Sequence, residues 1–148
     1  VARKNEFEIK KSVYRKLKYE SDNFIDSIKG CLTFKKNCEI SKKKIKQKII
    51  TILNSGKSIA GYAATSKSTT LLNYCGINHK HINFICDTTI NKIGKYSPRS
   101  HIPIVTVDHF RKNIPDYTFL FAWNHKKEIF LKEKSILKKT KWFAHVNI

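Results

Sequence analysis

Apolar residues are spaced like a helix in the first part of the chain and like short strands in the rest. Between Thr33 and Leu53 they fall mostly on one face, while lysines fill the other, which is the pattern of an amphipathic helix packed on a core. Asn54-Ser55-Gly56 should end that helix, because Gly56 can adopt the left-handed conformation of a C-terminal cap. We therefore expect this apolar stripe to be core rather than a ligand site.

The segment before this helix has a weaker pattern. We expect a short helix around Val13 with Ser12 as its N-terminal cap, and a helical stretch from Asp22 that is interrupted near Gly30. Val1–Lys4 resemble the tail of a strand that begins before this chain. The apolar content of the segment is thin, so it is predicted to lean on a domain outside it.

Strands and helices alternate in the rest of the chain. Short apolar runs predict strands at Lys57–Tyr62, Ile82–Cys86, Ile104–Val105, Tyr117–Ala122 and Lys141–Val146. Helices are predicted at Ser66–Cys75 with a stop at Gly76, from a Thr106 cap to Phe110, and at His125–Leu137. The predicted fold class is α/β: a Rossmann-like, doubly wound, mostly parallel sheet of about five strands, preceded by a helical segment. We assign residues 1–55 to that segment and residues 56–148 to the Rossmann-like domain.

The turn after the first strand is the strongest candidate for binding. It reads Gly61-Tyr62-Ala63-Ala64-Thr65-Ser66-Lys67-Ser68-Thr69-Thr70. Small side chains let the backbone approach a ligand, and free N–H groups at a helix start attract an anion. Thr65, Ser66 and Thr69 add hydroxyl donors, and Lys67 adds a positive charge. A tight turn that merely packs a helix on a sheet has the same pattern, so this alternative stays open.

Ligands of open α/β sheets bind at the carboxyl ends of the strands, which selects further candidates. Asp87 follows the second strand about where a Rossmann acid contacts a ribose hydroxyl. The predicted substrate-binding residues are Gly61, Tyr62, Ala63, Thr65, Ser66, Lys67, Thr69, Asp87, Lys92, Tyr96, His101, Trp123 and Asn124. The structural alternatives are that Asp87 caps a turn, Trp123 packs, and Tyr96 and His101 anchor their loop. No catalytic residue or metal ligand is predicted.

Composition and motifs narrow the function classes. The chain has 30 Lys and Arg against 11 Asp and Glu, a net charge of +19. Because the lysines are spread along the chain, a solvated face is favoured over an acidic or phosphorylated partner, and nucleic-acid binding is least favoured. Motifs of hydrolases, P-loop NTPases, NAD-binding proteins and metalloenzymes are absent from the sequence. Without a C-x-x-C pair or a long apolar run, we expect reduced cysteines, a cytoplasmic location and no membrane segment.

The residues of the turn also resemble a known family. Gly61 to Ile77, GYAATSKSTTLLNYCGI, is similar to the C-terminal domain of the sugar C-methyltransferases that use S-adenosylmethionine. Later segments agree in order and spacing: Lys92–Pro98 with His101–Ile104, then Pro115–Tyr117, then Ala122–Asn124 followed by Glu128-Ile129. The resemblance runs from about Gly56 to Phe143.

The resemblance implies a nucleotide-sugar substrate, typically a dTDP-linked keto-deoxysugar. Gly61–Thr70 would then hold its diphosphate, and Asp87 and the Lys92–His101 loop would border the nucleotide. The resemblance also implies an upstream methyltransferase domain that holds S-adenosylmethionine, and zinc in a further domain, with no cofactor bound by this segment. This segment alone is therefore not expected to be catalytic.

The sequence departs from the family pattern at several positions. Ala63 and Ser68 stand where glycines are usual, Thr88 and Asn91 replace an acidic residue and a proline, and Arg99 replaces a glycine. An added side chain narrows a turn that must touch a ligand. Two alternatives are kept: a non-catalytic nucleotide- or partner-binding Rossmann module and, less favoured, a basic nucleic-acid-binding protein.

Overall fold

All strand pairings of the central sheet are parallel in the computed structural model, which describes residues 9–146. The strands are β1 (Ile59–Tyr62), β2 (Ile85–Cys86), β3 (Ile104–Val105), β4 (Tyr117–Leu120) and β5 (Lys141–Phe143). Their order across the sheet is β3-β2-β1-β4-β5, so the chain builds one half outward from β1 and then returns to build the other. This confirms the predicted α/β class and Rossmann-like sheet.

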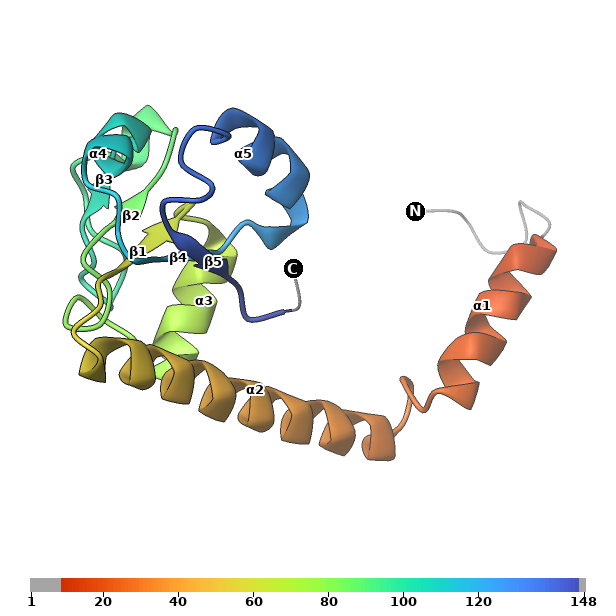
Figure 1. Cartoon of the computed structure of the whole chain (residues 1–148). Helices are drawn as coiled ribbons and strands as arrows, with labels where there is room; N and C mark the ends of the chain where they lie inside the picture. Colours follow the sequence, from red (N-terminus) through yellow and green to blue (C-terminus); the bar gives the residue numbers. More distant parts are fainter. Residues whose placement is uncertain (1–8, 147–148) are drawn as a thin grey trace. The chain divides into compact units, whose positions relative to one another are not determined.

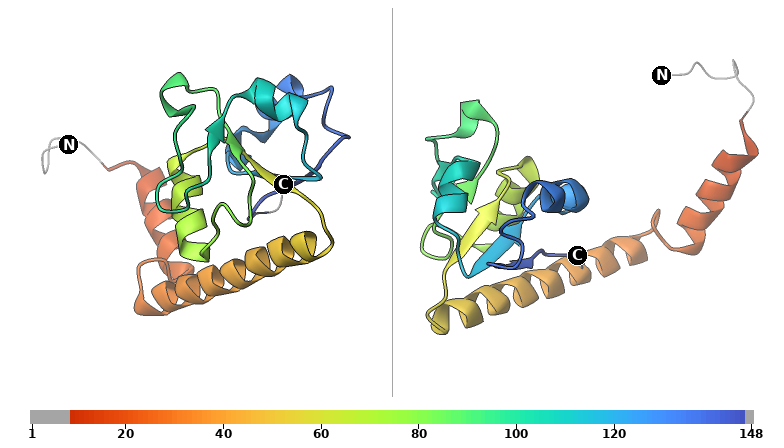
Figure 2. Two further views of the ribbon diagram at one scale, coloured as in Figure 1. Left: turned by 90° about the vertical axis from the view of Figure 1, so that its left-hand side faces the viewer. Right: turned by 45° about the horizontal axis from the view of Figure 1, so that its top comes forward.

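Helices cover both faces of this sheet, as Figure 1 and Figure 2 show. The end of α2 (Ile28–Asn54) and α3 (Ser66–Cys75) lie on one face, and α4 (Val107–Lys112) and α5 (Lys126–Lys132) on the other. The first face has a core that includes Ile49 and Phe119, and the second a core that includes Phe110 and Leu120. Successive residues of β4 thus enter opposite cores, as the pleat of a strand requires.

Local signals fix the helix ends around the sheet. The side chains of Thr65 and Thr106 accept backbone N–H bonds at the starts of α3 and α4. Gly56 and Gly76 follow the ends of α2 and α3 with φ of 72° and 66°, a conformation that costs glycine little. The predicted limits of α3, the helix ends at Gly56 and Gly76 and the Thr106 cap are confirmed, whereas the Thr65 cap was not predicted.

The chain before Ser41 forms a compact unit of its own, with α1 (Lys11–Asp22) and the first part of α2. None of residues 9–40 is buried. The Ser12 cap is wrong, because Ser12 lies inside α1 and the capping position belongs to Lys10, which makes no side-chain cap bond. The predicted break near Gly30 is also wrong. The helix breaks at residues 23–27, where Phe24 has a φ of 59°, and Gly30 lies inside α2, where a Cβ would collide with the Phe24 carbonyl.

Several predicted element ends need correction. β1 begins at Ile59, because the N–H of Ser58 donates to the carboxylate of Asp116 instead of to a strand. β2 begins at Ile85, the first residue that pairs with both β1 and β3, and the N–H of Ile82 bonds within the preceding turn. The ranges 117–122 and 141–146 extend beyond the residues that pair in the sheet. The range 125–137 runs into turns that follow α5, whereas the helix predicted for 33–53 begins earlier than expected.

Three other expectations concern the chain as a whole. Cys75 and Cys86 are buried and form no disulfide, as expected of reduced core residues. Among residues 9–146, no helix combines the length and the apolar character needed to cross a membrane. The strand tail predicted for Val1–Lys4 lies outside the described residues.

Candidate functional site at the carboxyl edge of the sheet

The carboxyl ends of β1 and β4 meet where the strand order changes direction. β1 ends at Tyr62 and β4 at Leu120, and the two strands pair along their whole length. The chain continues from β1 into α3 and from β4 into the short helix η2 (Trp123–His125) and α5. In open α/β sheets a ligand crevice forms at this switch point, and most of the predicted site residues follow these strands.

The β1–α3 turn presents two backbone N–H groups without acceptors. The Thr65 hydroxyl accepts the N–H of Ser68 at 3.1 Å, and the Thr65 carbonyl accepts the N–H of Thr69 at 3.2 Å. Within the described residues no hydrogen bond engages the N–H groups of Ser66 and Lys67, the first two of α3. Free amides at the positive end of a helix favour an anion.

Lys67 reaches across the switch point. Its Nζ donates to the side-chain oxygen of Asn124 at 3.2 Å and lies 5.7 Å from the centre of the Trp123 ring. Trp123 also packs edge-to-face on His145, with 6.3 Å between ring centroids. Burial, followed by the charge of Lys67, lowers the pKa of His145 and favours its neutral imidazole. The structure thus brings three predicted residues together and adds His145, which no motif in the sequence marked.

Asp87, which follows β2, holds the β1–α3 turn by hydrogen bonds. Its two oxygens accept the N–H groups of Ala64 and Thr89, each at 2.7 Å. Lys92, at the end of the short helix η1 (Ile90–Lys92), lies 3.5 Å from the carboxylate and donates to the Ala64 carbonyl at 2.8 Å. Burial raises the pKa of Asp87, but the hydrogen bonds from Thr89 and Ala64 and the charge of Lys92 outweigh it and hold the pKa below its ordinary value.

Two cavities flank the β1–α3 turn. The first, of about 310 Å³, lies between the start of α3 and the loop after η1. It is lined by Ala64, Thr65, Ser66, Ser68, Thr69, Asn91, Lys92, Lys95, Tyr96, Ser97, Pro98 and Ile104. This lining offers hydroxyls and two lysines without a carboxylate, which favours a negatively charged ligand. The second cavity, of about 340 Å³, extends toward Asp87 and α5 and shares Thr65 and Lys92 with the first.

The carboxylates of the sheet unit are all paired. Its five acidic residues form the ion pairs Asp87–Lys92, Asp108–Arg111, Asp116–Lys57, Glu128–Lys132 and Glu133–Arg111. No carboxylate of residues 41–146 is therefore left to pair with Lys67 or with Lys95, which lines the first cavity. The carboxyl edge keeps a positive potential that would attract an anion.

Eight of the thirteen predicted residues do not line the first cavity, among them Gly61, Tyr62 and His101. Gly61 is inside β1, where a Cβ would come within 2.6 Å of the Phe121 ring, so its small size serves packing in this structure. Tyr62 turns its hydroxyl to Glu133 at 2.8 Å, and its ring borders the second cavity. His101 lies three positions before the first residue of β3 and has a φ of 51°. It therefore lies toward the amino edge of the parallel sheet, opposite the edge that carries the other candidates.

Sequence reasoning missed a buried ionic group beside the second cavity. Glu133 is 1% exposed, and its carboxylate accepts bonds from Nε and Nη2 of Arg111 at 3.0 and 2.9 Å. Burial, followed by the hydrogen bond to Glu133, raises the pKa of Tyr62, whose hydroxyl completes the group. No sequence signal marked Glu133, because it follows a lysine-rich helix and reads like a surface residue.

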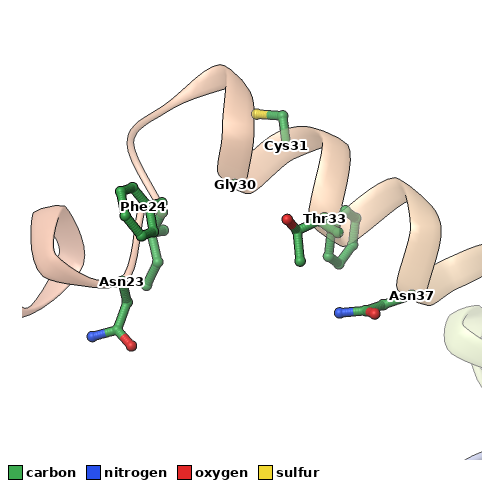
Figure 3. Close-up of a pocket in the computed structure, with 8 residues that line it drawn as sticks. Asn23, Phe24, Gly30, Cys31, Thr33 and Asn37 are labelled. Atoms are coloured by element: carbon green, nitrogen blue, oxygen red, sulfur yellow. The ribbon is translucent and has the colours of Figure 1, made fainter.

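A larger cavity, of about 490 Å³, lies in the N-terminal unit (Figure 3). It is lined by Asn23, Phe24, Ile25, Gly30, Cys31, Thr33, Phe34 and Asn37. Figure 3 shows Asn23 and Phe24 at the bend between α1 and α2, and Thr33 and Asn37 on the first turns of α2. The lining is mostly apolar and carries no charged side chain, so it lacks the positive charge that would attract a phosphate.

The parallel sheet and the crevice at its switch point define a Rossmann-like α/β domain of the kind that holds ligands at its carboxyl edge. The family model of the C-methyltransferase C-terminal domain matches residues 1–146, and the chain belongs to this family. The resemblance found in the turn and the later segments is thereby confirmed at the level of C-methyltransferases.

A curated relative agrees with this assignment. The chain is similar to the C-methyltransferase NovU of Streptomyces niveus, with 41% identity over 93 residues. The match covers 63% of this chain and 22% of the relative. The chain therefore spans about a fifth of the length of the curated relative it matches.

Proposed function

We propose that this chain is the substrate-binding domain of a C-methyltransferase that uses S-adenosylmethionine, and that its substrate is a nucleotide-linked sugar such as a dTDP-deoxysugar. The observation that carries the proposal is the carboxyl-edge cavity, which gathers hydroxyls, lysines and free helix amides without a carboxylate. Membership of the C-methyltransferase C-terminal domain family supplies the context. A diphosphate is the part of such a substrate that these donors suit.

The proposed contacts divide among three segments. The N–H groups of Ser66 and Lys67, with the Thr65 and Thr69 hydroxyls, would hold the diphosphate at the start of α3. Lys67 would add its charge while Asn124 keeps its Nζ in place. The ring of Tyr96 at the first cavity and that of Trp123 at the switch point offer apolar faces to the base or the sugar.

The role of this domain would be to orient the sugar rather than to perform the methyl transfer. Fixing the diphosphate at the sheet edge limits where the sugar carbon lies relative to a methyl donor, and orientation of two reactants contributes several kcal/mol to many transfer reactions. S-adenosylmethionine would supply the methyl group from an upstream domain. Zinc would likewise be held by a further domain outside this segment.

Calorimetric titration of the chain with dTDP and a dTDP-sugar tests the proposal. UDP and a DNA duplex of random sequence serve as competing ligands, each at two salt concentrations. We expect dTDP binding that largely survives the higher salt and weakens in Lys67→Met. If the chain binds DNA but no nucleotide, and the affinity falls steeply with salt, its binding is nonspecific charge attraction and the proposal is refuted. Absence of binding to every ligand would refute a substrate site that is complete within this chain.

A further inference from the structure

The β1–α3 turn contains a strained residue. Ala63 has a φ of 73°, in the left-handed region, although it carries a Cβ. This conformation is unfavourable for residues other than glycine, and it persists where surrounding contacts enforce it. Ala63 lies directly between the last residue of β1 and the segment that leads to the α3 cap. Its conformation therefore decides where the free amides at the start of α3 point.

The contacts that enforce this conformation lie on the next residue. Asp87 accepts the N–H of Ala64 at 2.7 Å, and Lys92 donates to the carbonyl of Ala64 at 2.8 Å. Both backbone groups of Ala64 are thus held by side chains from the β2 side, and the 3.5 Å ion pair joins those side chains to each other. The N–H of Ala63 itself bonds to the carbonyl of Cys86, the last residue of β2, at 2.8 Å. The strained residue is thus held through its own N–H and through both backbone groups of the residue that follows it.

We propose that Asp87 and Lys92 are positioning residues that hold the strained turn in the form that binds the ligand. Without them Ala63 would relax toward negative φ, which rotates the Ala63–Ala64 peptide and displaces Thr65 and the first amides of α3. The inference rests on the proposed function for its ligand, a nucleoside diphosphate. It gives Asp87 and Lys92 a role through Ala64 rather than through direct contact with that ligand.

The geometry favours this role over a ribose contact for Asp87. Its side chain is 7% exposed, and each of its oxygens already accepts a backbone N–H. A residue that binds ribose hydroxyls needs an accessible oxygen that points into the cavity. Lys92 likewise has two protein partners, whereas Lys95, on the same cavity, has no side-chain bond among the described residues. Lys95 therefore serves as a matched control of equal charge.

The test combines the clamp with its strained target. Affinity for dTDP is measured in Lys92→Met, Ala63→Gly, the double variant and Lys95→Met. Because left-handed backbone is disfavoured for alanine but open to glycine, we expect Lys92→Met to bind about ten-fold more weakly and Ala63→Gly to restore most of that loss in the double variant. Lys95→Met should lose affinity through charge alone, and adding Ala63→Gly to it should restore nothing. Equal affinities of the double variant and Lys92→Met would overturn the proposal.

A ligand-free measurement separates this inference from the proposed function. Hydrogen exchange of the Ala64 amide, followed by NMR, should accelerate in Lys92→Met and slow again in the double variant. Asp87→Asn should show the same acceleration and the same rescue by Ala63→Gly. Should the parent chain fail to bind dTDP, the proposed function falls, and the exchange rates still decide the clamp. Unchanged exchange in both clamp variants would refute it.

Discussion

Removing Arg111 should destabilise the fold strongly, because it leaves a buried carboxylate with a single partner. The guanidinium of Arg111 donates twice to Glu133, at 2.9 and 3.0 Å, and the remaining partner is the hydroxyl of Tyr62. Breaking a fully buried ion pair costs about 3–5 kcal/mol. Arg111 itself is 43% exposed, so water replaces part of the lost interaction, and we expect about 2–3 kcal/mol for Arg111→Met.

A double-mutant cycle isolates the interaction from the packing of each residue. Apolar replacement of both partners of a buried pair is often tolerated. The Arg111→Met/Glu133→Leu variant should therefore be more stable than the two single costs predict, by about 1–3 kcal/mol. Urea unfolding followed by tryptophan fluorescence gives each free energy of unfolding. Additive single costs would refute the reasoning, because they would show that Arg111 and Glu133 do not stabilise each other.

The exposed pair of Glu128 and Lys132 provides the matched control. Its N···O distance of 2.7 Å is shorter than those of the buried pair, but both side chains are at least 60% exposed. Burial rather than distance should set the cost. Lys132→Met should therefore leave the urea midpoint unchanged within error. A large shift would show that burial does not set the cost of losing an ion pair in this protein.

Two further changes test the packing and the electrostatics of the sheet edge. Gly61→Ala should lower the free energy of unfolding by about 1–3 kcal/mol, because its Cβ would meet Phe121 and Ile85 in a closed core. A thermal midpoint equal to that of the parent would show that β1 has room for a side chain. Because burial and Lys67 lower the pKa of His145, the unfolded chain takes up a proton first, and stability should fall as pH drops below about 6.5. His145→Gln should flatten thermal unfolding midpoints between pH 7 and 5, and an unchanged slope would contradict this assignment.

The elements that the sequence predicts best are those with local end signals. Gly76 predicts the end of α3 and Thr106 the start of α4, and the structure adds a Thr65 cap of the same local kind at the start of α3. These contacts join residues three or four positions apart, so the pattern contains all of their information. The grouping of the β1–α3 turn with residues that follow β4 could also be predicted from the sequence, because the topology brings the carboxyl ends of parallel strands together.

What the sequence did not reveal depends on contacts between distant positions. Tyr62 and Glu133 are 71 residues apart, and a glutamate after a lysine-rich helix carries no sign that it is buried. The placement of His101 has a comparable cause. The loop from β2 returns to the amino edge before β3 begins, so its last residues leave the site that its first residues border. The sequence placed Asp87 at the carboxyl end of the second strand, where the structure has it, but its backbone partners emerge only from the folded turn.

The position of the lysines says more about function than the net charge of +19 does. Lys42 and Lys48 lie over the rings of Tyr74 and Phe143, at 4.6 and 4.7 Å from the ring centres, so their stems contribute to packing. Diffuse attraction to nucleic acid draws on all exposed lysines and falls steeply with salt. A diphosphate site needs few donors, and those at the start of α3 are fixed in direction by the helix and by Asn124. Affinity that survives salt therefore distinguishes the turn from the rest of a very basic surface.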